Sequence, residues 1–128
     1  TTQTGGWSCG PAIAAEPATF DYGQPWSLVA TNADPGAMAI INFGDSITSL
    51  QGVALPIDLA TFGAPSCFLN INLISSIGAM ADAQGRVEVP FLIPGSLFGQ
   101  LQSSYFQIGT STGANGLGFA TSEYLEIF

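Results

Sequence analysis

The side chains of this sequence that could do acid–base chemistry are almost all carboxylates. The chain has nine Asp and Glu residues, one Arg, no Lys and no His. Nucleophilic catalysis needs a base beside the nucleophile, so composition excludes Ser-His-Asp, Cys-His and Ser-Lys sites. Two carboxylates are enough for glycoside hydrolysis. The candidates for such a pair are Asp21, Asp34, Asp45, Asp58, Asp82, Glu88, Glu123 and Glu126.

Most of these carboxylates lie in predicted turns or on predicted solvent faces, where water solvates them, and we predict that the protein is not an enzyme. Asp34, Asp45 or Asp82 could bind calcium together with loop carbonyls. No spacing matches an EF-hand loop, however, and turn capping is the commoner role of an Asp there. Two cysteines without a His cannot complete the usual four-ligand zinc shell. We therefore expect neither a metal nor a cofactor.

Aromatic side chains offer a second kind of chemistry, the stacking of sugar rings on a flat surface. The residues that could form such a row are Trp7, Tyr22, Trp26, Tyr105 and Tyr124. The alternative is core packing with some aromatic residues at the boundary of the core, and this is the interpretation that we favour.

The two cysteines, Cys9 and Cys67, are typical of a protein from an oxidising compartment. If they are bridged, they close a loop of 58 residues (67 minus 9). Chain-entropy arguments then give roughly 4 kcal/mol of stabilisation. The alternative is a pair of free, buried thiols.

Charge and hydropathy restrict the partners. Hydrophobic residues make up 47% of the chain and charged residues 8%, against about 25% charged residues in an average protein. The net charge of -8 opposes binding to nucleic acid and to anionic lipid. No run approaches the ~18 apolar residues that a membrane span needs. A weakly charged, apolar monomer needs its apolar surface covered, and other copies of the same chain would cover it.

The start of the sequence, Thr1-Thr2-Gln3-Thr4, is typical of a mature protein, and it shows no charged segment followed by an apolar one. We therefore expect a secreted protein, extracellular or on the cell surface, whose signal peptide has been removed.

Short alternating or apolar runs separated by turn signals predict about eight or nine strands. Residues 1–10 form a polar N-terminal arm, and residues 11–128 are expected to form a single antiparallel β-sandwich, Ig-like or jelly-roll-like. The stretch Leu55–Pro94 is expected to be its centre, with residues 74–81 as a strand end or edge. Within it, Asp58 either faces outward or pairs with Arg86. The predicted strands are 18–22, 26–31, 37–44, 55–59, 67–73, 86–93, 103–108, 119–121 and 123–128.

Six short motifs occur in a fixed order along the chain. They are Cys9-Gly10, Leu55-Pro56-Ile57-Asp58-Leu59, Gly63-Ala64-Pro65-Ser66-Cys67, Asp82-Ala83-Gln84-Gly85-Arg86-Val87, Ile93-Pro94 and Gly113-Ala114-Asn115-Gly116-Leu117-Gly118. Together they resemble a short all-β module found, often at the C-terminus, in predicted secreted proteins of planctomycete-type bacteria. Ser66 stands where that module usually has a glycine, and the polar arm before Cys9 is a second departure. The resemblance implies a secreted β-sandwich with a Cys9–Cys67 disulfide, and it implies no activity.

Two functions fit these observations. The first is a non-enzymatic structural protein that polymerises with copies of itself into an extracellular filament, tubule or surface layer. The N-terminal arm with Trp7, and an edge strand with Tyr124 and Phe128, are the expected subunit contacts. The second is a cell-surface module that binds carbohydrate or mediates adhesion, with surface glycans as partners.

Overall fold

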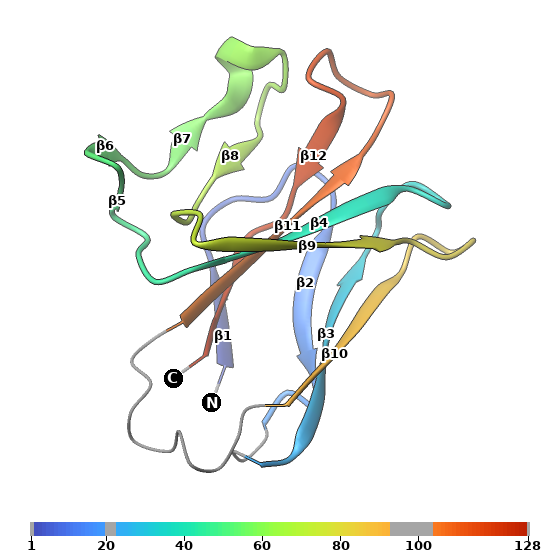
Figure 1. Ribbon diagram of the computed structural model, residues 1–128. Coiled ribbons are helices and arrows are strands. Elements are labelled where there is room, and N and C mark those ends of the chain that lie inside the picture. Colours follow the sequence, from blue (N-terminus) through green and yellow to red (C-terminus); the bar gives the residue numbers. More distant parts are fainter. Residues whose placement is uncertain (1, 20–22, 93–103, 128) are drawn as a thin grey trace.

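The computed structural model describes residues 2–19, 23–92 and 104–127, and strands dominate it (Figure 1). The strands are β1 (Thr2–Gly5), β2 (Ala12–Glu16), β3 (Pro25–Thr31), β4 (Met38–Gly44), β5 (Ser49–Leu50), β6 (Val53–Ala54), β7 (Ile57–Asp58), β8 (Phe68–Leu69), β9 (Ser75–Met80), β10 (Val87–Leu92), β11 (Ser104–Ser111), β12 (Phe119–Thr121) and β13 (Tyr124–Ile127). One 3-10 helix, η1, covers Leu59–Phe62. None of the helical segments described could cross a membrane by its length and hydropathy.

Two antiparallel sheets face each other, which confirms the predicted all-β antiparallel sandwich. Sheet A has the strand order β1-β13-β11-β4-β9, with β12 also paired to β11. Sheet B has the order β10-β3-β2. Two small hairpins, β5–β6 and β7–β8, lie outside both sheets. The N-terminal strand β1 belongs to sheet A, where Thr2 lies opposite Ile127 and Gly5 opposite Tyr124.

The described residues contain thirteen strands, more than the eight or nine predicted. Of the strands that were not predicted, β5 and β6 have two residues each and are too short for alternation to show. Strand β1 is polar throughout, and the inward side of β2 consists of Ile13 and Ala15. The predicted strand 18–22 is partly outside the described residues.

The core lies between the two sheets, because alternate residues of each strand point inward. On sheet B, one inward row joins Val87, Ala30 and Ile13 across three strands. On sheet A, Ile108 and Ile41 form a facing row. Trp26 and Leu28 of β3, at 2% and 1% exposure, complete the contact. This regular inward and outward alternation is why β3, β4, β10 and β11 could be recognised in the sequence.

The outer face of sheet B carries an ion pair. Nη2 of Arg86 lies 2.7 Å from Oε2 of Glu16 and 3.7 Å from Oε1 of Glu88. Arg86 adjoins β10 and Glu16 ends β2, so the pair bridges the strand between them, where Val29 is buried. The hydrogen bond to Glu16 raises the pKa of the Arg86 guanidinium. The suggested pairing of Arg86 with Asp58 is therefore wrong, because Asp58 instead accepts a hydrogen bond from the Ala60 N–H and caps η1.

The first half of the stretch Leu55–Pro94, residues 55–73, lies beside sheet A and outside both sheets, and we call this segment the excursion (green in Figure 1). The expected central position of the stretch is therefore wrong. The predicted strands 55–59 and 67–73 shrink to β7 and β8. Gly63 has a left-handed φ of 96°, and Ser66 a left-handed φ of 66°, so the chain turns here. Among its apolar residues, Ile71 is fully buried.

Buried amide groups fix this excursion to sheet A. Gln107, on β11, accepts a hydrogen bond from the Asn70 N–H and donates to the carbonyls of Phe68 and Ser122. Asn70 donates to the carbonyls of Trp7 and Ser122. Both amide side chains are at least 97% buried, since their exposed fractions are 1% and 3%. A buried network of this kind specifies one position for the excursion, because any shift leaves polar groups unpaired.

Candidate functional site: the open edge of the sandwich

Strand β9 ends sheet A with an apolar, uncharged edge. The side chains of Ile74, Ile77 and Met80 are 55%, 44% and 64% exposed. The twelve residues from 70 to 81 contain no ionisable side chain. Within the described ranges, β9 pairs with β4 on one side and with no strand on the other. An edge of this kind presents unpaired peptide groups to any strand that approaches.

The pairing of β9 with β4 shows which peptide groups point outward. The Ala81 N–H donates to the Ala37 carbonyl at 2.8 Å, directly after β9. Bonded and non-bonded residue pairs alternate along an antiparallel ladder. The N–H and C=O groups of Ile77 therefore turn toward β4, while those of Ser76 and Gly78 turn outward. A partner strand would form its hydrogen bonds with these two residues.

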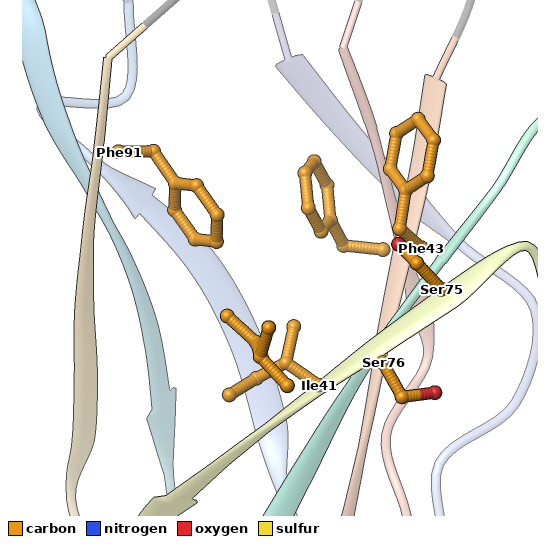
Figure 2. Close-up of a pocket in the computed structure, with 7 residues that line it drawn as sticks. Ile41, Phe43, Ser75, Ser76 and Phe91 are labelled. Carbon is orange, nitrogen blue, oxygen red and sulfur yellow. The ribbon is translucent and has the colours of Figure 1, made fainter.

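An apolar cavity of about 250 Å³ lies on the inner side of this edge (Figure 2). Its lining residues are Ile41, Phe43, Ser75, Ser76, Ile77, Phe91 and Phe106. Figure 2 shows Phe91 reaching into the cavity from sheet B, opposite Phe43 and Ile41 from sheet A. The cavity exists because β9 and β10 diverge from their connecting turn, one following sheet A and the other sheet B (Figure 1).

Four aromatic rings pack between the two sheets, and three of them, Phe43, Phe91 and Phe106, line the cavity. Trp26 stacks on Phe91 at a centroid distance of 5.1 Å and meets Phe106 edge-on at 5.9 Å. Phe106 also contacts Phe91 at 5.5 Å and Phe43 at 5.4 Å. This cluster fixes the inner boundary of the open edge, because each ring contacts at least one other ring in a favourable arrangement.

The opposite edge of sheet A is β1, which is short and polar. Gln3 donates to Oε1 of Glu126 at 2.8 Å, and the Thr2 hydroxyl donates to the Ala18 carbonyl at 2.8 Å. Gly5 lies under the Tyr124 ring, where a Cβ atom would overlap the phenol group. The arm is thus held by its own chain, and among the strands that the structure describes the outer side of β1 is the second uncharged edge.

The predicted subunit contacts lie at different places. Trp7 is 56% exposed and rests on Phe68, with ring centroids 5.3 Å apart. Tyr124 is half-buried and meets Tyr105 edge-on at 5.5 Å. Phe128 lies outside the described residues. Their role as contacts between copies stays a prediction.

The five aromatic residues considered for sugar stacking do not form one row. Trp26 is only 2% exposed and belongs to the core, as the core-packing alternative expects. Tyr22 lies outside the described residues. The remaining three, Trp7, Tyr105 and Tyr124, are at least partly accessible.

The carboxylates mostly bind backbone or amide groups of their own surroundings. Oε1 of Glu123 accepts from the Ile13 N–H at 2.7 Å. Oδ1 of Asp82 accepts from the N–H groups of Gln84 and Arg86. Oδ1 of Asp45 accepts from Nδ2 of Asn72 at 2.7 Å. Among the residues with assigned positions, no group of three or more His, Cys, Asp and Glu side chains could hold a metal ion. Asp21 lies outside the described residues.

Cys9 and Cys67 form a disulfide, with Cα atoms 5.0 Å apart, so the free-thiol alternative is wrong. The bridge ties the segment after β1 to the excursion, next to the Asn70–Gln107 network. Sequence reasoning did not identify that network. The signal for it was the presence of Asn70 and Gln107 within otherwise apolar runs.

The open edge itself had one signal in the sequence, the absence of charge from residue 70 to residue 81. No protein-family model matches this chain, and a search of curated protein sequences finds no match either.

Proposed function

We propose that this protein is a secreted, non-enzymatic structural protein that assembles with copies of itself into an extracellular filament, tubule or surface layer. The observation that carries this proposal is a difference between the sheets. Both edges of sheet A, β1 and β9, are free of charged residues, whereas both edges of sheet B carry them.

Natural sheets protect exposed edges with charged side chains, prolines or short strands, because an unprotected edge pairs with other chains. Strand β10 contains Glu88 and Pro90 and follows Arg86, and β2 ends with Glu16. Strand β9 has six residues, and it contains neither a charged side chain nor a proline. The protein thus protects both edges of sheet B with charged residues and leaves the β9 edge of sheet A ready for pairing.

The charge of the whole chain supports the same proposal. Copies with a net charge of -8 repel one another at pH 7, so association is least opposed where the contacting surfaces carry no charge. The β9 edge is such a surface, and its exposed isoleucine and methionine side chains gain from being covered. The disulfide supports an oxidising, extracellular location.

Electron microscopy and light scattering of three proteins would test the proposal. The natural chain should form regular polymers. Gly78→Lys should prevent or shorten them, because it places a charge among the outward peptide groups of β9, where a Cβ atom would meet only the Ala39 carbonyl oxygen, at 4.0 Å. Ala14→Lys, at an exposed position of β2, is the matched control and should polymerise normally. Each lysine lowers the net negative charge, so loss of assembly in Gly78→Lys alone would reflect the edge. A natural chain that stays a 13.2 kDa monomer at every concentration would contradict the proposal.

Carbohydrate binding is the second candidate, and the exposure of Trp7 on Phe68 favours it. It predicts a monomer whose affinity for glycans falls when Trp7 is changed to Ala. A glycan screen of the natural chain and of Trp7→Ala would separate this candidate from the first, since self-assembly through β9 does not require the Trp7 ring.

A further inference from the structure

We infer that the primary contact between copies is an antiparallel pair of β9 strands, related by a two-fold axis at Ile77. This inference deepens the proposed function and rests on it, because it identifies the partner of the open edge as the same edge of a second copy. It follows from three features of β9: its side-chain pattern, the direction of its peptide groups and the cavity behind it.

The pattern of β9 is symmetric about Ile77. Large apolar residues occur at positions 74, 77 and 80, and each gap holds two small residues. In an antiparallel pair centred on Ile77, paired residue numbers add to 154. Ile77 then lies opposite itself, Ile74 opposite Met80 of the second copy, and Ser75 opposite Ala79 of the second copy. Large residues meet large ones and small residues meet small ones, so the edge is complementary to itself.

The peptide groups fit the same register. Ser76 and Gly78 direct their N–H and C=O groups away from β4. Centred on Ile77, the pair places Ser76 opposite Gly78 of the second copy and Gly78 opposite Ser76 of the second copy. Each couple is then a hydrogen-bonded pair, and Ile77 is the non-bonded pair between them. A register shifted by one residue would place an inward-turned peptide opposite an outward-turned one and lose these bonds.

The cavity supplies the apolar contact on the inner side. Ile77 continues the inward row of Ile108 and Ile41 and lines the cavity together with Phe91. In the two-fold pair, Ile77 of the second copy becomes the next member of this row. It lies beside the cavity mouth, where it covers apolar surface that a single copy leaves accessible.

Charge selects a second copy over the alternatives that an apolar edge would accept. A basic partner would gain most at the acidic surfaces of this protein, away from residues 70–81. Two identical chains gain most where both are uncharged. A two-fold contact closes on itself and gives a dimer. Growth into a polymer then uses a second contact, and the outer side of β1, at the other edge of sheet A, is placed to provide it.

Cysteine cross-linking tests the axis directly. Residues at a non-bonded antiparallel pair have Cα atoms about 4.5 Å apart, within the range of a disulfide. Under mild oxidation, most of the Ile77→Cys protein should therefore become a covalent dimer. Ser76→Cys is the register control, because its counterpart lies roughly 8 Å away across the axis and cannot be bridged. Ala14→Cys, exposed on β2, is the control for random collision.

Light scattering of Ile77→Lys, without oxidant, provides the second measurement. We expect dimer formation to weaken at least tenfold relative to the natural chain, and Ala14→Lys should match the natural chain. Cross-linking of Ile77→Cys no faster than that of Ala14→Cys would overturn the inference. Polymers that persist in Ile77→Lys would also overturn it while leaving the proposed function intact. A dimer that cross-links at Ile77 but never polymerises would support the inference and contradict the proposed function.

Discussion

Strands β9 and β10 are neighbours along the chain, six residues each, and both are edge strands on the same side of the sandwich. They differ in chemistry. Strand β10 contains Glu88 and Pro90, and Arg86 beside it is paired with Glu16. Strand β9 contains no charge and no proline. Position in the fold therefore does not explain why β9 is unprotected.

The comparison shows that protection was available and is used on one strand only. Proline cannot donate to a sheet, and charged side chains resist burial in a contact, so β10 is a poor partner for another strand. The turn before β10 connects it to β9, an edge strand in which these features are absent. Substitutions that change this difference between the two strands therefore test the role of each edge in assembly.

The largest expected effect is on the stability of the whole sandwich, on which the β9 and β10 edges both depend. Phe106→Ala removes the ring that contacts Trp26, Phe43 and Phe91 between the sheets. We expect a loss of about 3–5 kcal/mol in the free energy of unfolding, measured by urea denaturation. Phe62→Ala is the control, because Phe62 is 60% exposed and its loss should cost within about 0.5 kcal/mol. A fully stable Phe106→Ala protein would show that this cluster does not hold the edges in place.

The next effect separates the two edges from each other. Met80 on β9 and Leu92 on β10 are similarly exposed, at 64% and 60%. Met80→Lys should weaken self-association at least tenfold, about 1.4 kcal/mol, because it adds charge to the unprotected edge. Leu92→Lys should leave association unchanged. Sedimentation over a range of concentrations would measure both, and equal behaviour of the two variants would remove the distinction between β9 and β10.

Removing the protection of β10 should have a smaller effect, of opposite sign. Changing Arg86 and Glu88 together to Gln removes both charges at the start of this strand and keeps the net charge at -8. We expect a few-fold gain in association, limited by Pro90, which still lacks a donor. Light scattering against the natural chain would detect this gain. Weaker association in the variant would contradict the role given to these charges.

The smallest effect concerns the charge of the whole chain. The net charge is -8 at pH 7 and approaches zero as the pH falls toward the isoelectric point of about 4.1. Repulsion between copies therefore decreases with falling pH, and association should strengthen a few-fold. Raising salt at pH 7 screens the same repulsion without protonation and should act in the same direction. A critical concentration that rises under both conditions would show that attraction between charges drives assembly.

Much of the fold could be predicted from the sequence, because β3, β4, β11 and β13 each bury a recognisable face. The strand at β9 was harder to interpret. Its large residues recur every third position, so they fall on alternate faces of the strand and give neither a strand nor a helix signal. The predicted edge at residues 74–81 was correct in place, but its apolar exposure emerged only from the pairing with β4.

Other errors have a common physical cause. The runs 55–59 and 67–73 are apolar, and an apolar run indicates burial without indicating which partner buries it. Here the two runs lie outside both sheets, and hydrogen bonds of Phe68 and Asn70 to Gln107 attach them to sheet A. The aromatic residues pose the same problem, since composition does not distinguish Trp26 in the core from Trp7 at the surface.

The Cys9–Cys67 bridge has a consequence for a subunit under mechanical load. The bridge closes a covalent ring of 58 residues that runs through strands of both sheets. Stretched out, those residues would span about 200 Å at roughly 3.4 Å each. While the bridge is intact, a pull on the chain cannot release that length. A fibre built from such subunits would therefore resist elongation under oxidising conditions and become extensible when reduced.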